Sequence, residues 1–375
     1  MANIHDYDDI RPFMPEELPA VYDRLISDPS FRNAIETVYK GVPYEHVAQM
    51  IRSTKSSNEF QKVCVYPVLK NLIDNASTGL TSDFTAIKDD TSRAYTFVSN
   101  HRDIVLDSAL LCYALIEAGM STVEIAIGDN LLIHPWIKDL VRVNKSFIVQ
   151  RALTMRQMLM ASAKMSSYMH FAINEKHENI WIAQREGRAK DSNDRTQESV
   201  LKMMAMGGEG SVIDRLKSLN IVPLAISYEF DPCDYLKAME FQNKRDIEGF
   251  KKSKQDDLDN MKIGIFGYKG HIHYHAAPCI NDWLDSLDPD TPKTDIFRIV
   301  AEHIDKEIHS NYCLYPCNLA AADTLQTGNR HEEFEAYIAK KLSLVTLDNP
   351  DTEFLRQSIL TMYANPALNK AKAEN

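Results

Sequence analysis

Apolar side chains along residues 1–92 recur at intervals of three and four, the spacing that makes one face of an α-helix apolar. Pro67 interrupts such a run within residues 60–75. Because proline lacks an amide donor and crowds the preceding turn, it predicts a kink or a break between two helices. Residues 76–82 are mostly small and polar and predict a loop. The pattern therefore predicts a helical N-terminal region, residues 1–92.

After residue 92 the pattern changes to short β-type runs that alternate with amphipathic helices. The runs predicted as strands are residues 95–98, 122–127, 146–149, 179–183 and 221–228. The runs predicted as helices are residues 155–172, 196–206, 234–260 and 295–308, with a helical tail from residue 329. The Met-rich helix at 155–172 is expected to pack in the core, since methionine fills irregular cores. Residues 262–266 and 271–275 predict a hairpin. The alternation predicts an α/β domain over residues 93–375, a mixed sheet flanked by helices.

Composition narrows the class of protein. The chain has 375 residues, of which 44% are hydrophobic and 25% charged, as in ordinary soluble globular proteins. Its formal net charge of −11 argues against a nucleic-acid partner, which would need a basic surface. Its six cysteines are scattered and are expected to be reduced thiols. The first residues lack the basic and apolar segments of a signal peptide, and no apolar run is long enough to span a bilayer, so we expect a cytoplasmic protein.

Three alternating histidines, His271, His273 and His275, share one face of a predicted strand. No carboxylate or cysteine lies near them at the spacing of zinc ligands. A solvated strand face is therefore favoured over a metal site, and no metal is expected.

Polar side chains that could carry chemistry flank four of the predicted strands. Each stretch is a weak signal alone, because surface arginines usually form ion pairs of little energy and glycine is common in turns. A proline inside a strand likewise indicates an edge or a bulge. The candidates are His101, Asp103 and Asp107 in the first stretch; Gly128 to Leu131, Arg142, Lys145, Phe147, Ile148 and Arg151 in the second; Gln184 to Lys190, which includes Arg185, Glu186, Gly187 and Arg188, in the third; and Ile221 to Glu229, which includes Pro223, in the fourth.

In order and spacing, these stretches resemble the four motif blocks of the glycerolipid acyltransferases. This family includes glycerol-3-phosphate, dihydroxyacetone-phosphate and lysophosphatidate acyltransferases. The resemblance covers roughly residues 95–230. The matching blocks are Asn100-His101 through Asp107; Gly128-Asp129-Asn130-Leu131 with Phe147 to Arg151; Arg185-Glu186-Gly187-Arg188; and Ile221-Val222-Pro223 with Ile226-Ser227-Tyr228-Glu229. The second and fourth blocks are closer to the glycerol-3-phosphate branch than to the lysophosphatidate branch.

The resemblance implies transfer of a fatty acyl group from acyl carrier protein or coenzyme A to a hydroxyl of glycerol 3-phosphate in phospholipid synthesis. His101 would be the general base and Asp107 the residue that orients it. The phosphate-binding cations would be Arg151, Arg185, Arg188 and Lys145, with Glu186, Gly187 and Pro223 as further substrate-binding positions.

No cofactor is implied beyond the thioester co-substrate. The implied setting is the cytoplasm, with peripheral contact at the inner membrane face. Two alternatives remain open. The acceptor could instead be lysophosphatidate or a lyso-aminolipid, or the chain could be a non-catalytic lipid-binding protein of the same fold.

The first block departs from the family in its spacing. Five residues separate His101 from Asp107, where the family usually has four, and a single residue separates His101 from Asp103. Positions six apart on a regular helix lie about 240° apart around the axis and do not face each other. His101 is therefore expected in the loop before the helix, or in a bulged first turn. The apolar residues after Asp107 favour it as the partner, and Asp103 is the alternative.

Overall fold

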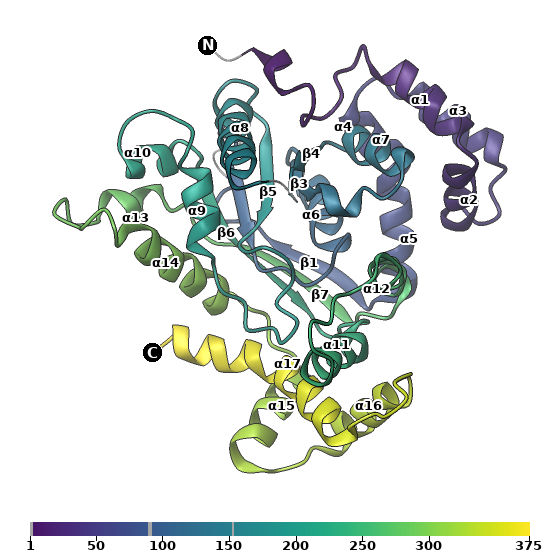
Figure 1. Ribbon diagram of the computed structural model, residues 1–375, viewed down its shortest axis with the longest axis vertical. Helices are drawn as coiled ribbons and strands as arrows, with labels where there is room; N and C mark the ends of the chain where they lie inside the picture. The colour runs from purple at the N-terminus through teal and green to yellow at the C-terminus, as the bar shows by residue number, and fades with distance from the viewer. Residues whose placement is uncertain (1–2, 89–91, 152–153) are drawn as a thin grey trace.

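The computed structural model describes residues 3–88, 92–151 and 154–375, and at its centre is a seven-stranded sheet (Figure 1). The strands are β1 (Gly79–Asp83), β2 (Thr96–Ser99), β3 (Val123–Gly128), β4 (Ser146–Val149), β5 (Asn179–Ala183), β6 (Ile221–Tyr228) and β7 (His271–Ala276). Their order is β1-β7-β6-β2-β5-β3-β4. The β6–β7 pair is antiparallel and the other pairs are parallel. The predicted α/β class with a mixed sheet is confirmed.

Helices cover both faces of this sheet, because the buried strand side chains alternate between two apolar cores. Phe97 of β2 faces the core made with α5 (Tyr66–Ala76) and α6 (Leu106–Glu117). The next residue, Val98, faces the opposite core. The helices of that second face are α8 (Met155–Asn174), α9 (Glu198–Met204), α10 (Val212–Lys217), α13 (Asn281–Asp285) and α14 (Ile296–Ser310).

A separate helical cluster lies at the N-terminal end of the chain (Figure 1). Its elements are α1 (Leu18–Ser27), α2 (Pro29–Val38), α3 (Tyr44–Ser53), α4 (Ser57–Phe60) and the π-helical turn η2 (Gln61–Val65), and α7 (Pro135–Val143) packs against them. The preceding turn η1 (Ile4–Tyr7) packs instead on α8 through Tyr7. No break between two helices occurs at Pro67: α4, η2 and α5 follow one another without a gap, and the π-helical turn η2 is the irregularity that precedes the proline, which lies in the first turn of α5. The loop predicted at residues 76–82 is wrong: β1 begins at Gly79 and pairs with β7 as an edge strand.

A second helical cluster, at the C-terminal end, packs against the helix that follows β6. It contains α11 (Asp234–Asp246), α15 (Pro316–Thr327), α16 (Glu332–Leu342) and α17 (Thr352–Ala373). Tyr337 and Tyr363 both donate a hydrogen bond to the buried Asp234 of α11, at 2.5 and 2.9 Å. These bonds tie the last helices of the chain to α11.

Three predictions about elements are corrected by the structure. The hairpin is wrong, because residues 262–266 belong to α12 (Lys254–Phe266) and β7 pairs instead with β1 and β6. The helix predicted over 234–260 is two helices, α11 and α12. The Met-rich helix α8 is buried only in its second half. Met155, Met158, Leu159 and Met160 in its first turns are exposed.

No helix in the described ranges combines the length and the apolar character needed to cross a membrane.

The parallel strands β2 to β6 place the ends of several predicted motif blocks at one edge of the sheet. His101 follows β2, η3 (Asp129–Leu131) follows β3, Arg151 follows β4 and Arg185 follows β5. Carboxyl ends of parallel strands meet at the same edge, which is where α/β proteins commonly bind ligands.

Candidate active site

His101 and Asp107 form a direct hydrogen bond at this edge. The Nδ1 atom of His101 lies 2.8 Å from Oδ2 of Asp107. His101 is in the loop between β2 and α6, and Asp107 is in the first turn of α6. The wide spacing of the two residues is therefore accommodated by the loop, which curls back over the start of the helix. The imidazole is 15% exposed and the carboxylate 1% exposed.

The Asp107 carboxylate also holds the loop in place. Its Oδ2 accepts the backbone N–H groups of Arg102 at 2.6 Å and Asp103 at 3.0 Å, and its Oδ1 accepts the hydroxyl of Tyr228 at 3.2 Å. All these partners donate hydrogen bonds to Asp107, as an ionised carboxylate requires because it can only accept them. With Nδ1–H assigned by this network as the donor to Asp107, Nε2 is the nitrogen of His101 that can accept a proton.

Asp103, the alternative partner, has a different role. Its Oδ1 accepts the backbone N–H groups of Val105 and Leu106, both at 2.8 Å, and so caps the start of α6. Burial raises the pKa of Asp103, and the neighbouring Asp107 raises it further. Within the described contacts, the structure pairs His101 with Asp107 and not with Asp103.

Buried charges behind the loop fix the position of His101. The Arg102 guanidinium donates to Asp194 Oδ2 at 3.1 Å and lies 3.7 Å from Asp231 Oδ2. Lys237 of α11 donates to the carbonyl oxygen of Arg102 at 3.0 Å and also binds Asp231. The loop is thus held between α11 and the segment after β5. Asn100, at the loop start, exchanges two amide hydrogen bonds with the backbone of Ile226, at 2.8 and 2.9 Å.

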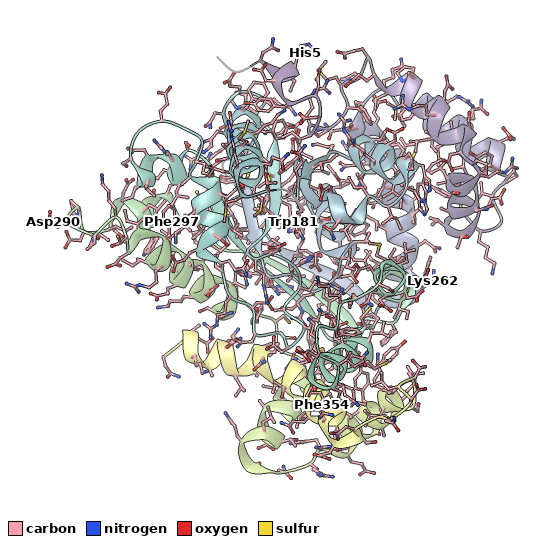
Figure 2. The ribbon with its side chains drawn as sticks, in the orientation of Figure 1. His5, Trp181, Lys262, Asp290, Phe297 and Phe354 are labelled. Carbon is pink, nitrogen blue, oxygen red and sulfur yellow. The ribbon has the colours of Figure 1, made fainter. Side chains whose placement is uncertain are left out.

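His101 lines a cleft of about 630 Å³, within the size range of small-molecule sites. Its apolar lining includes Ile125, Met165 and Trp181. The Trp181 ring lies edge-on to the His101 ring with a centroid separation of 5.8 Å, and Figure 2 labels Trp181 near the middle of the molecule. Beside His101, the charged residues of the lining are Arg151, Arg185, Glu186, Arg188, Lys190, Lys252 and Asp257. The cleft therefore joins an apolar surface to a group of cations.

The predicted residues Arg151, Arg185, Glu186, Gly187 and Arg188 all line this cleft with His101. Arg151 lies 3.3 Å from Glu186 (Nη1 to Oε1). Arg185 Nε has no hydrogen-bond partner within the described part of the chain. Gly187 has φ +69°, a left-handed conformation that favours glycine. The loop after β5 thus brings two arginines and a turn to the cleft wall.

Gly128 allows Arg151 to approach the end of β3. A Cβ atom at Gly128 would lie 3.0 Å from Arg151 Nε and 2.5 Å from Asn130 Oδ1. The backbone N–H of Arg151 donates to both carboxylate oxygens of Asp129, at 3.1 and 3.2 Å. The Gly-Asp-Asn-Leu block therefore places Arg151 in the cleft.

Lys145 and Pro223 are not among the residues that line the cleft. Lys145 is buried and bonds Glu178 at 2.7 Å. It lies just before β4, at the amino ends of the parallel strands, whereas His101 lies at their carboxyl ends. Pro223 is buried in β6 beside Val98, and β6 is an interior strand and not the predicted edge. Pro223 lies one residue beyond the Leu224–Ala276 pair that ends the β6–β7 ladder, and its carbonyl oxygen accepts the N–H of Ala277 at 2.9 Å.

The motif analysis assigned no role to several residues that the structure brings to the site. Asn100 and Tyr228 stood inside the first and fourth blocks, so position in the blocks could have identified them. Lys190 stood at the end of the third stretch without a role of its own, and Trp181 and Lys252, which also line the cleft, had no such signal.

The histidines of β7 do share one face, and His273 Nδ1 lies 2.8 Å from the hydroxyl of Thr81. Over residues 3–88, 92–151 and 154–375, no group of three or more His, Cys, Asp or Glu side chains is arranged to hold a metal ion.

Comparison with protein-family models finds no matching family, and comparison with curated proteins finds no matching relative.

Proposed function

We propose that the protein is an O-acyltransferase that moves a fatty acyl group from acyl carrier protein or coenzyme A to a hydroxyl of glycerol 3-phosphate. The observation that carries this proposal is the His101–Asp107 pair, at 2.8 Å, in a cleft that also contains arginines. A general base beside cations is what a phosphorylated alcohol needs in order to react as a nucleophile.

In this reaction His101 Nε2 accepts the proton of the acceptor hydroxyl as its oxygen attacks the thioester carbonyl. A C–O bond forms, the C–S bond breaks, and the thiolate leaves and takes up a proton from the imidazolium. Asp107 keeps Nδ1 protonated and stabilises the imidazolium, as in serine hydrolases, and no covalent enzyme intermediate is needed.

Substrate binding is divided between the two kinds of cleft wall. Arg151, Arg185 and Arg188 bind the acceptor phosphate, since guanidinium groups form charge-assisted and bidentate bonds to phosphate. The apolar wall with Met165 and Trp181 accommodates the acyl chain. Glu186 positions Arg151 through their ion pair.

The deciding experiment measures thioester consumption with acyl-CoA and acyl carrier protein thioesters, with and without glycerol 3-phosphate. We expect acceptor-dependent thiol release that His101→Ala abolishes while the circular dichroism spectrum stays unchanged. His331→Ala is the matched control, because His331 pairs with Asp323 at 2.6 Å but is not part of the cleft lining. Normal turnover by His101→Ala would refute the role of His101.

The same assay separates the alternatives. Lysophosphatidate and a lyso-aminolipid, run beside glycerol 3-phosphate, identify the acceptor. A non-catalytic lipid-binding protein would bind lipid without releasing thiol from any donor. The unusual His-to-Asp spacing was the main support for that reading, and it loses weight because the two side chains bond directly.

We also propose peripheral contact with the inner face of a membrane, through the exposed first turns of α8. Met155 is 86% exposed there, and Leu159 and Met160 are each 64% exposed. Met158 is also exposed and is one of the residues that line the cleft. An apolar patch that continues into a cleft suits an enzyme whose substrate or product is a lipid. Leu159→Glu should reduce co-sedimentation with anionic phospholipid vesicles, whereas Leu344→Glu, at an exposed leucine in another part of the chain, should not.

A further inference from the structure

A cluster of lysines surrounds one buried carboxylate beside the cleft. Glu240 of α11 is 4% exposed and contacts three ammonium groups. Lys244 Nζ and Lys252 Nζ each lie 2.9 Å from a Glu240 oxygen, and Lys190 Nζ bonds it as well. Lys190 comes from the segment after β5, and Lys252 from the segment between α11 and α12. Glu240 thus gathers cations from separate parts of the chain.

The three ammonium groups carry more positive charge than the Glu240 carboxylate can neutralise. One ammonium neutralises one carboxylate, and the only other acidic oxygen that forms an ion pair with them in the described residues is that of Asp257, 3.9 Å from Lys252. An excess positive charge remains, in a chain whose net charge is −11. Burial, together with the charges of Lys244 and Lys252, lowers the pKa of Lys190 to about 8, although Glu240 raises it. A bound anion would relieve this repulsion.

Lys190 and Lys252 both line the cleft that contains His101. Each side chain is 18% exposed, so the ammonium groups are reachable but partly desolvated. Of the arginines assigned above to the acceptor, Arg151 follows β4, whereas Arg185 and Arg188 share the segment after β5 with Lys190. The cleft therefore has more cations than one phosphate of glycerol 3-phosphate requires.

We infer that Lys190 and Lys252 form a second anion subsite, which binds the phosphate ester of the pantetheine arm of the thioester donor. This inference rests on the proposed acyl transfer. Acyl carrier protein and coenzyme A both attach their thiol through a phosphorylated pantetheine, so one subsite serves both carriers. Glu240 is a positioning residue that holds the two ammonium groups together.

The experiment compares donors that differ in phosphate. Initial rates are measured with acyl-CoA, acyl carrier protein thioester and S-acyl pantetheine, which has no phosphate. Lys190→Gln and Lys252→Gln should each raise KM for both phosphorylated donors by about tenfold, the size of one lost charge-assisted bond, and leave KM for S-acyl pantetheine and for glycerol 3-phosphate unchanged. A loss confined to acyl-CoA would assign the subsite to the other phosphates of coenzyme A and overturn the shared-arm assignment. An equal rise for all three donors, or a rise in the acceptor KM, would overturn the inference entirely.

Two controls protect this result. Lys252→Arg keeps the charge and should keep KM near the wild-type value, which a purely structural loss would not allow. Lys217→Gln removes a lysine that pairs with Asp285 and is not part of the cleft lining, and should change nothing. Calorimetric binding of coenzyme A alone needs no turnover. If the wild-type protein consumes no thioester but binds coenzyme A and loses that binding in Lys190→Gln, the proposed function fails while the anion subsite stands.

Discussion

Two histidine–aspartate pairs in this protein have similar lengths and different surroundings. His101 and Asp107 are 2.8 Å apart, and His331 and Asp323 are 2.6 Å apart. The second pair is more than a third exposed on both sides, and Asp323 otherwise accepts bonds from nearby Thr327 and Asn329. Asp107 instead is buried and accepts backbone N–H groups and a tyrosine hydroxyl. A short distance therefore does not distinguish the two pairs; the burial of the carboxylate and the cleft beside the imidazole do, and they are the reason why His101–Asp107 is the pair proposed as catalytic.

The largest expected effect tests this comparison directly. Asp107→Asn should lower kcat by about 10³–10⁴-fold, because the amide can no longer keep Nδ1–H as the donor and stabilise the imidazolium. Asp323→Asn, the equivalent change in the exposed pair, should leave kcat unchanged. Equal activity in the two variants would remove the distinction between the pairs.

The next effect concerns the geometry of the loop. A Cβ atom at Gly264 of α12 would lie 2.2 Å from Asp103 Oδ2, so Gly264→Ala must displace the side chain that caps α6. We expect kcat to fall by about 10²-fold, as for other small misplacements of catalytic groups. Adding Asp103→Ser should restore part of the rate, since serine is shorter and still caps a helix. No loss in the single variant would show that the loop tolerates the shift.

A smaller effect separates two predicted phosphate-binding cations. Arg185→Met should raise KM for glycerol 3-phosphate by roughly 10- to 100-fold, the size of one or two charge-assisted bonds. Lys145→Met should leave that KM unchanged but lower the free energy of unfolding by about 1–2 kcal/mol, because it leaves Glu178 without its partner. Kinetics and urea unfolding of both variants test the contrast, which a higher acceptor KM in Lys145→Met would contradict.

The smallest effect on activity extends the comparison to a third carboxylate. Burial raises the pKa of Asp305 to about 6, although Thr196 donates two hydrogen bonds to it. The folded protein therefore binds a proton at Asp305 more tightly than the unfolded chain does. The ionised carboxylate destabilises the fold most above pH 6, and this destabilisation decreases as the pH drops. Asp305→Asn should raise the free energy of unfolding by about 2 kcal/mol near pH 7.5 and by less near pH 5, with kcat unchanged. A gain that did not shrink at low pH would show that ionisation is not its cause.

The sequence predicted the parts of the site that follow strands. His101, Arg151 and Arg185 each come directly after a short apolar run, and parallel pairing brings such positions to one edge of the sheet. Lys145 stands one residue before its strand, so the same pairing sends it to the opposite edge. For that reason Lys145 does not line the cleft, although it is close to Arg151 in the sequence and was predicted to bind phosphate with it.

Other features could not be predicted because their partners are far apart in the chain. Lys190 meets Glu240 across 50 residues; Lys190 stood at the end of the third stretch, but nothing in the sequence marks Glu240 as its partner. The false hairpin arose because residues 262–266 mix apolar side chains with glycine, and such a short run fits a strand as well as it fits the end of a helix. β1 was missed because its sequence is polar, as an edge strand can be.

The bonds between Tyr363 and α11 carry a consequence for biosynthesis. Tyr363 donates to Asp234, and Lys237 of the same helix donates to the carbonyl of Arg102 next to the proposed base. A ribosome makes residues 352–373 long after residues 100–107, so the nascent chain has its histidine loop before the helix that braces it exists. The bracing of the histidine loop through α11 should therefore be complete only after residues 352–373 have been made, and shorter nascent chains should lack the proposed acyl transfer.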